Sequence, residues 1–300
     1  MTTHRAFDWI ILILLVVIWG SAYAAMKIAV EHISPLWNTA ARLWIAVATL
    51  GLVLAVSRQP LPSLSDRAWA FYALNGLVGM AVPFALFATA AVALPSAVNA
   101  ICNGASPIFT AGLAHLLLAG EKLTRRKAAG VGLGFVGLLA LVAPRMSQGF
   151  NVETLALAAA LGGAGLYAVS NIITKRAPPV PSRVGAFMFC AWGAAFATLN
   201  AVVLGPAPTW PPMSSLLAVT ALGVFSTGLA TVGYVFLIQR RGPLFTSMSI
   251  YLAPIWATII GVALMHERPS WTAFAALALI LAGVALTTTA PRAKAASAQP

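Results

Sequence analysis

The chain has 300 residues, of which 60% are hydrophobic and only 8% charged, whereas a soluble domain carries about a quarter charged residues. This composition excludes a soluble globular protein and predicts an integral membrane protein. Eighteen basic residues against six acidic ones give a net charge of +12. The placement of these charges decides whether they face nucleic acid or lipid.

Ten apolar runs follow one another along the chain, separated by short polar or proline-rich segments. A hydrocarbon core about 30 Å thick needs roughly 20 apolar residues per helix, and the runs are 9–30, 35–56, 68–94, 96–119, 128–143, 155–174, 184–204, 214–238, 244–265 and 271–289. The first run resembles a signal peptide, because Arg5 precedes it and "AYA" occupies 22–24. Since its apolar stretch continues to Val30, we expect it to be retained. We therefore predict an all-α integral membrane fold of ten transmembrane helices.

The basic residues divide unequally between alternate loops. With the N-terminus in the cytoplasm, the inner side holds 14 of the 18: Arg5, Arg58, Arg67, Lys122, Arg125, Arg126, Lys127, Lys175, Arg176, Arg183, Arg240, Arg241, Arg292 and Lys294. The outer loops hold only Arg145 and Arg268, and this asymmetry fits the positive-inside rule. We expect both termini to be cytoplasmic and the basic loops to face anionic lipid and not nucleic acid.

The stretch "SPIFTAGLAHLLLAGEKLTRRKAAGVGLGFVG" at 106–137 resembles "APIWATIIGVALMHERPSWTAFAALALILAG" at 253–283. Each contains a proline, a glutamate and a glycine in the same order, namely Pro107, Glu121 and Gly137 in the first and Pro254, Glu267 and Gly283 in the second. The chain is accordingly divided into a five-helix repeat over 1–148, a second over 149–289, and a flexible cytoplasmic tail over 290–300. Because five is odd, the second repeat enters the membrane in the opposite sense.

Inverted repeats predict a function as well as a fold. Two similar halves of opposite orientation can expose a shared site first to one side of the membrane and then to the other, which is alternating access. This favours a secondary transporter of small molecules. The alternatives are a membrane enzyme or a lipid-handling protein, for which the sequence shows no catalytic cluster.

The fourth apolar run carries polar residues on one face. Pro95, Asn99, Asn103 and Pro107 are spaced by four residues, which places them on the same side of a helix. Pro107 removes a backbone hydrogen bond near the middle of the membrane, and a freed carbonyl is tolerated there only against protein or a watery cavity. The asparagines either join neighbouring helices or line a cavity, and the midplane proline favours the cavity.

Other runs carry polar or aromatic side chains at similar depth. The predicted substrate-binding residues, from all of these runs, are Trp19, Tyr23, Asn75, Asn99, Asn103, Tyr167, Asn171, Tyr234 and Tyr251. The predicted hinge or gating residues are Pro83, Pro107, Pro254, Gly76, Gly79 and Gly228. Such a pocket is apolar and aromatic with a few amide and hydroxyl groups, which suits a neutral or zwitterionic solute with an apolar side chain.

Charged residues are scarce inside the runs. All six acids lie at helix ends or in loops, and this disfavours cationic drugs as primary substrates, since a transporter for cations is expected to hold a carboxylate in the membrane. Lys27 and Arg42 are expected near the outer ends of their helices, reaching the interface or pairing with Glu31. The alternative is that they attract a substrate carboxylate or phosphate.

Nothing in the sequence predicts catalysis, a metal site or a cofactor, because no common catalytic motif is found. Cys102 and Cys190 are expected to be buried thiols. Gly130 and Gly134 have the "GxxxG" spacing that allows close helix approach, either within the chain or between copies. The oligomeric state, monomer or homodimer, is left open.

These features resemble the drug/metabolite transporter superfamily, EamA-like branch. The resemblance rests on "IWGSAYAAMK" near the start, on "AARLWIA" with Arg42 in the second run, and on the proline-to-glutamate block in both halves. Within the superfamily the chain is most similar to bacterial inner-membrane aromatic amino-acid exporters of the YddG type. The resemblance implies a central cavity between the two halves, and a protein that exports amino acids with apolar or aromatic side chains. Sugar-phosphate or nucleotide-sugar transport is the alternative within the superfamily.

Overall fold

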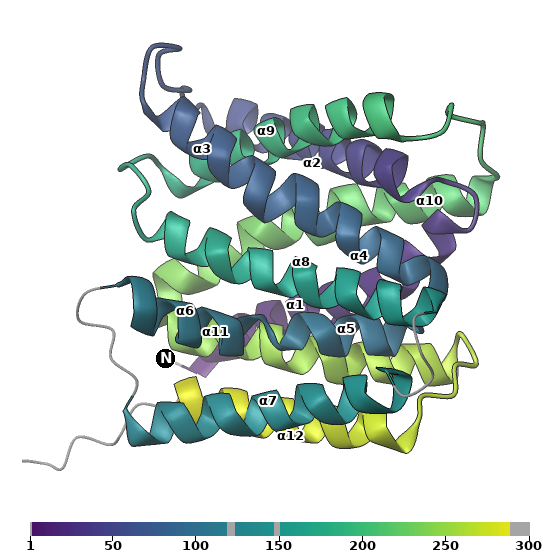
Figure 1. Ribbon diagram of the computed structural model, residues 1–300. Helices are drawn as coiled ribbons and strands as arrows, with labels where there is room; N and C mark the ends of the chain where they lie inside the picture. The colour runs from purple at the N-terminus through teal and green to yellow at the C-terminus, as the bar shows by residue number, and fades with distance from the viewer. Residues whose placement is uncertain (1, 119–123, 147–150, 289–300) are drawn as a thin grey trace, which may run out of the picture.

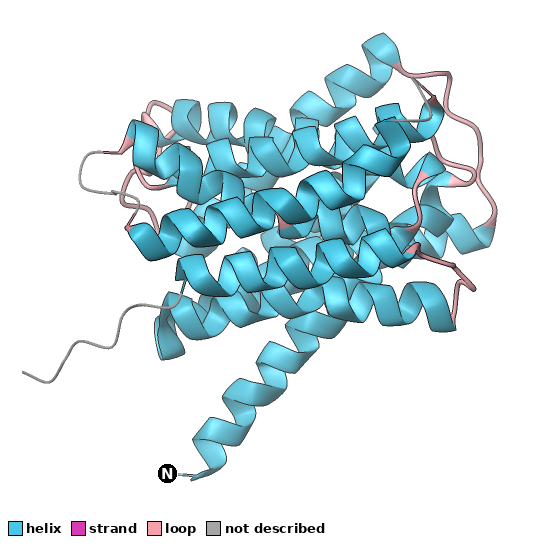
Figure 2. Ribbon diagram, turned by 60° about the horizontal axis from the view of Figure 1, so that its bottom comes forward, coloured by secondary structure: helices cyan, strands magenta, loops and turns pink. Residues whose placement is uncertain are grey.

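The computed structural model describes residues 2–118, 124–146 and 151–288, so Glu121 and the predicted tail 290–300 lie outside it. Over the described residues the chain forms helices joined by loops (Figure 2). The first repeat contains α1 (Thr2–Val30), α2 (Pro35–Ser57), α3 (Ala68–Gly76), η1 (Leu77–Ala81), α4 (Val82–Ala93), α5 (Ser96–Gly104), α6 (Ser106–Leu117) and α7 (Arg125–Met146). The second contains α8 (Val152–Thr174), α9 (Ser182–Leu204), α10 (Met213–Ala221), η2 (Leu222–Leu229), α11 (Ala230–Ala263) and α12 (Trp271–Thr288).

These helices make a multi-pass membrane bundle. Within the described ranges, nine spans are long and apolar enough to cross a bilayer, and 271–287 forms a shorter apolar helix. The prediction of an all-α fold with ten transmembrane helices in two inverted five-helix repeats is confirmed. Several spans comprise more than one element, since α3, η1 and α4 make one, α5 and α6 the next, and α10, η2 and the first part of α11 another.

Helix ends follow local sequence signals. Ser34 Oγ accepts a hydrogen bond from Trp37 N at 3.4 Å, and Pro35 occupies the first turn, where its missing N–H costs nothing. Asn151 Oδ1 accepts from Thr154 N at 2.9 Å and begins α8 in the same way. A polar side chain therefore caps the start of one span in each repeat, α2 in the first and α8 in the second.

Packing joins equivalent helices of the two repeats. Helices α7 and α12 lie side by side along one edge of the bundle, and α2 packs against α9 towards the opposite edge (Figure 1). At Gly130 an added Cβ would lie 2.6 Å from the carbonyl oxygen of Gly283. The "GxxxG" pair is thus used for close approach of α7 to α12 within the chain.

Three predicted runs depart from regular α-helix. The run 96–119 is broken at Ala105 between α5 and α6, because Pro107 has no N–H to donate to the carbonyl of Asn103. The second part, α6, ends at Leu117. The third span of each repeat contains a π-helical segment, η1 or η2, and such segments are frequent at functional sites. The eighth and ninth runs join in α11 at Gly242, whose φ of 81° is a conformation that glycine adopts without strain.

Candidate functional site

A cavity of about 450 Å³ lies in the middle of the bundle, between the two repeats. Its lining comes from α1, α2, the third span of each repeat, α5 and α6, α8, α9 and α11. Six aromatic side chains contribute to the wall: Trp19, Tyr23, Phe84, Phe87, Tyr167 and Phe189. This volume falls within the range of small-molecule sites.

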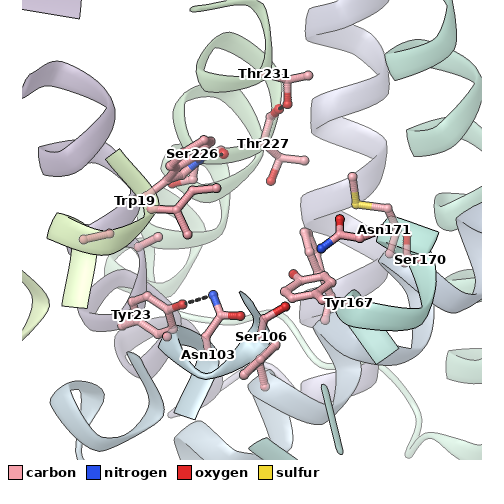
Figure 3. Close-up of a pocket in the computed structure, with 18 of the residues that line it drawn as sticks. Trp19, Tyr23, Asn103, Ser106, Tyr167, Ser170, Asn171, Ser226, Thr227 and Thr231 are labelled. Carbon is pink, nitrogen blue, oxygen red and sulfur yellow. Dashed lines mark hydrogen bonds between the residues drawn. The ribbon is translucent and has the colours of Figure 1, made fainter. Parts of the chain in front are cut away.

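Polar groups occupy defined parts of the same wall. Figure 3 shows Tyr23, Asn103 and Ser106 along one side, with Thr227 and Thr231 across the cavity. Asn103 Nδ2 donates to the hydroxyl of Tyr23 at 2.6 Å, which joins α5 to α1. Within the described part of the chain the amide oxygen of Asn103 accepts no hydrogen bond, so it can accept one from a solute.

Aromatic contacts order the apolar side of the cavity. The Tyr167 ring lies 5.5 Å from the Phe87 ring and 6.2 Å from the Phe84 ring, measured between centroids. These separations are typical of favourable aromatic pairs. Tyr167 comes from the second repeat and the two phenylalanines from the first, so the cluster joins the halves.

Segment η2 is held by neighbours from the first repeat. Trp19 Nε1 donates to the backbone carbonyl of Ser226 at 3.0 Å, and Arg42 Nε donates to Thr227 Oγ1 at 2.9 Å. A π segment ends where the hydrogen-bond spacing returns from five residues to four, and a carbonyl at this return is left for other donors. The irregular backbone of the second repeat is thereby satisfied at Ser226 by α1, while α2 holds the side-chain hydroxyl of Thr227.

The predicted site residues divide into two groups by position. The cavity wall contains Trp19, Tyr23, Asn103, Tyr167, Asn171, Pro107, Pro254 and Gly79. The structure places the others behind the wall: Asn75, Asn99, Tyr234, Tyr251, Pro83, Gly76 and Gly228. In the fourth run the wall takes Asn103 and Pro107 and leaves Asn99 behind it, because each step of four residues turns a helix by about 400° and a longer series drifts off one face.

The residues behind the wall have partners of their own. Asn99 is fully buried and donates to the carbonyl of Phe87 at 2.9 Å. Asn75 donates to Thr174 Oγ1 at 2.9 Å and accepts from Ser170 Oγ at 2.7 Å, so it supports two lining hydroxyls. The Tyr234 ring packs at 5.4 Å from Trp19. These residues position the wall, and the structure does not bring them to the cavity.

Two predicted charge positions need correction. Lys27 pairs with Glu267 Oε1 at 3.4 Å, not with Glu31, because the loop before α12 folds back over the start of α5. Arg42 is 8% exposed and lines the cavity, so it does not reach the interface. Arg42 is the eighth residue of α2, about 10 Å along the helix. This depth already indicates a position inside the membrane, and the sequence prediction did not use it.

Glu267 joins the loop before α12 to α1 and to the N-terminus of α5. Its carboxylate is 6% exposed and accepts from Ser96 N at 2.7 Å, Ser96 Oγ at 3.0 Å and Ala97 N at 3.2 Å. A carboxylate at a helix N-terminus satisfies free backbone N–H groups and is favoured by the helix dipole. The acid of the second repeat thus caps α5 of the first.

Further lining residues were not predicted. Phe84, Phe87, Met80 and Phe189 have the same residue types as the lipid-facing positions, so composition does not distinguish them. Thr227 and Thr231 are hydroxyl residues inside the eighth apolar run, and both line the cavity. Hydroxyl residues inside an apolar run were therefore a usable signal, and apolar ones were not.

A bundle of two inverted five-helix repeats around a central solute-sized cavity defines a multi-pass membrane transporter. The profile of the EamA-like transporter family matches residues 8–143 and 154–289, and the chain belongs to that family. The chain is 28% identical to the inner membrane transporter YedA of Escherichia coli strain K12, over 91% of this chain and 88% of YedA. It is 30% identical to the aromatic amino acid exporter YddG of Ancylobacter novellus, over 79% of each. A solved crystal structure with 25% identity covers 95% of this chain and 98% of its own, with a TM-score of 0.68.

Proposed function

We propose that this transporter exports amino acids with apolar or aromatic side chains by alternating access across a bacterial inner membrane. The observation that carries the proposal is the cavity between the repeats, where aromatic rings and the Asn103 amide share one wall. Aromatic rings favour the side chain of such a solute, and an amide favours its polar end. The similarity to an aromatic amino acid exporter supports the same substrate class.

Alternating access is supported by the arrangement of the two ends of the cavity. The lining extends to Asn171 and Thr174 near the C-terminal end of α8, and both are exposed. At the other end, Glu267 and Lys27 join the second repeat to α5 and α1. We take the first end as cytoplasmic because Lys175 and Arg176 follow α8 directly and basic loops face the cytoplasm.

Transport by proteoliposomes tests this function. Radiolabelled phenylalanine, leucine, lysine and a sugar phosphate are compared in parallel, with and without a pH gradient, against protein-free liposomes. We expect saturable uptake of phenylalanine and leucine. Uptake of the sugar phosphate alone would overturn the amino-acid assignment, and strong dependence on the gradient would indicate proton coupling.

A further inference from the structure

Arg42 is a cation buried in the wall of the cavity. Its guanidinium carbon lies 4.2 Å from the centroid of the Phe84 ring, and its Nε donates to Thr227 Oγ1 at 2.9 Å. Only 8% of the surface of Arg42 is exposed, and Arg42 is itself one of the residues that line the cavity. The guanidinium is held by one helix from each repeat and is close to the solute space.

The described ion pairs do not include Arg42. Among the described residues, Asp8 pairs with Arg240 and Arg241, and Glu267 pairs with Lys27. An arginine keeps its charge in proteins and has five N–H donors, of which the described hydrogen bonds use the one on Nε. Burying a charge without an opposite partner is costly, and such a cation inside a membrane usually marks a functional position.

We propose that the guanidinium of Arg42 is an anion site within the cavity and binds the carboxylate of the transported solute. The planar terminal nitrogens suit two parallel hydrogen bonds to a carboxylate. This inference rests on the proposed transport function and narrows its substrate class. The transported class is an amphipathic monocarboxylate whose apolar part lies against Phe84, Phe87 and Tyr167.

The position of Arg42 in the wall predicts which charged group of an amino acid is needed for binding. A positive group in the wall attracts a carboxylate and repels an ammonium, and both effects are strong where water is excluded. An aromatic acid without an amino group therefore keeps the contact with Arg42 and loses only the hydrogen bond that an ammonium would donate to the Asn103 amide oxygen. An aromatic amine, or an amino acid amide, lacks the group that Arg42 binds.

The wild-type protein tests this selectivity without any variant. Uptake into proteoliposomes is measured for phenylalanine, 3-phenylpropionate, phenylalaninamide and phenethylamine, each corrected for protein-free liposomes. We expect phenylalanine and 3-phenylpropionate both to be transported. Phenylalaninamide and phenethylamine are expected to be transported at least about tenfold less efficiently than phenylalanine, since one charged hydrogen-bonded contact exceeds about 1.4 kcal/mol. Transport of all four alike would overturn the role of Arg42 and leave the transport function standing.

Two other outcomes separate the claims. Uptake of 3-phenylpropionate without any amino acid would overturn the amino-acid function and support the carboxylate site. Preference for phenyl phosphate over 3-phenylpropionate would overturn the carboxylate assignment in favour of a phosphate ester. Transport of none of these compounds would overturn both proposals.

Variants of Arg42 sharpen the assignment. In Arg42→Gln we expect the KM for phenylalanine to rise at least about tenfold, with the KM for phenylalaninamide unchanged, because only the carboxylate loses its partner. Arg42→Lys keeps the charge but not the planar fork, and we expect an intermediate KM. The control is Arg176→Gln, which removes an exposed cation outside the cavity and is expected to change neither value. Equal rises in both KM values for Arg42→Gln would contradict carboxylate binding and indicate a structural role.

Discussion

The third and fourth spans of the two repeats share backbone features but contribute different side chains to the cavity. Both third spans contain a π segment, and both fourth spans contain a midplane proline, Pro107 or Pro254. The first repeat adds Phe84 and Phe87 to the wall, whereas η2 adds Ser226 and Thr227. The two third spans thus share an irregular backbone, while their side chains form an aromatic wall in the first repeat and a hydroxyl wall in the second. An amphipathic solute needs both kinds of wall.

The fourth spans differ in the same way. When Pro107 is aligned with Pro254, Asn103 corresponds to Ile250, and both residues line the cavity. The chain breaks at Ala105 in the first repeat, whereas in the second α11 continues past Pro254. The two prolines therefore have unequal effects, and the broken span carries the amide.

The largest expected effect comes from glycines that are equivalent in the two repeats. Gly76 and Gly223 are separated by the same 147 residues as the two prolines. An added Cβ would lie 2.8 Å from Gly193 N in the first case and 2.8 Å from the Arg42 carbonyl in the second. We expect Gly76→Ala and Gly223→Ala each to destabilise the protein by about 1–3 kcal/mol through overpacking, measured as a lower Tm in detergent.

Gly112→Ala is the matched control, because a Cβ at Gly112 meets nothing within 4 Å. Alanine is the better helix former, so its Tm is expected to be equal or higher. A normal Tm for both Gly76→Ala and Gly223→Ala would show that these approaches are not tight in the membrane. A normal Tm for only one would show that the repeats pack differently there.

The next effect comes from removing the charge of Glu267, which joins the loop before α12 to Lys27 and to the start of α5. In Glu267→Gln the charge facing Lys27 and the start of α5 is lost while the size is kept, and we expect a cost of about 2 kcal/mol, in the range of hydrogen bonds to charged groups. The measurement is again the Tm in detergent. Glu31→Gln removes an exposed acid near the end of α1 and should leave the Tm unchanged. Equal Tm values for the two variants would exclude a stabilising role for Glu267.

A smaller effect is expected from making the fourth spans alike. Asn103→Leu replaces the amide with an apolar side chain like that of Ile250, and we expect transport efficiency for phenylalanine to fall about tenfold, which corresponds to 1.4 kcal/mol. The measurement is kcat/KM in proteoliposomes, with Ile250→Leu as the volume-conserving control at the equivalent position. An Asn103→Leu protein that transports normally would remove Asn103 from the binding site.

The last prediction concerns the solvent accessibility of two cavity residues and not the stability of the protein. Tyr23 and Asn171 hold the same place in "WGSAYAAMK" at 19–27 and "YAVSNIITK" at 167–175, which match in the first spans of the repeats. Tyr23 is buried against Asn103, whereas Asn171 is exposed. With Cys102 and Cys190 replaced by alanine, we expect a membrane-impermeant maleimide to label Asn171→Cys faster than Tyr23→Cys, and from the cytoplasmic side. Faster labelling of Asn171→Cys from the periplasmic side would reverse the proposed orientation of the termini.

The residue types in the apolar runs predicted the cavity residues better than the helix face on which the residues were expected to lie. Trp19, Tyr23 and Asn103 are predictable because polar and amphipathic groups are unusual in apolar runs, and such groups collect at cavities. Asn99 and Asn75 satisfy the same criterion yet bond to a backbone carbonyl and to hydroxyls behind the wall. The sequence prediction placed Arg42 at the membrane interface, because a long basic side chain near a helix end can reach the interface by snorkelling. Whether it does so depends on its neighbours, and the contacts with Phe84 and Thr227 show that Arg42 stays inside.

Composition and spacing are sufficient for the membrane class, the ten spans and the inverted repeats, because each depends on local hydrophobicity or on the order of residues along the chain. The partners of Lys27, Arg42 and Glu267 come from distant segments, as Glu267 lies 240 residues from Lys27. No local pattern determines which of several helices will meet, since the lipid-facing and cavity-facing sides of an apolar helix have similar composition. The two walls of the cavity and the buried cation between them therefore follow from the packing of the repeats alone.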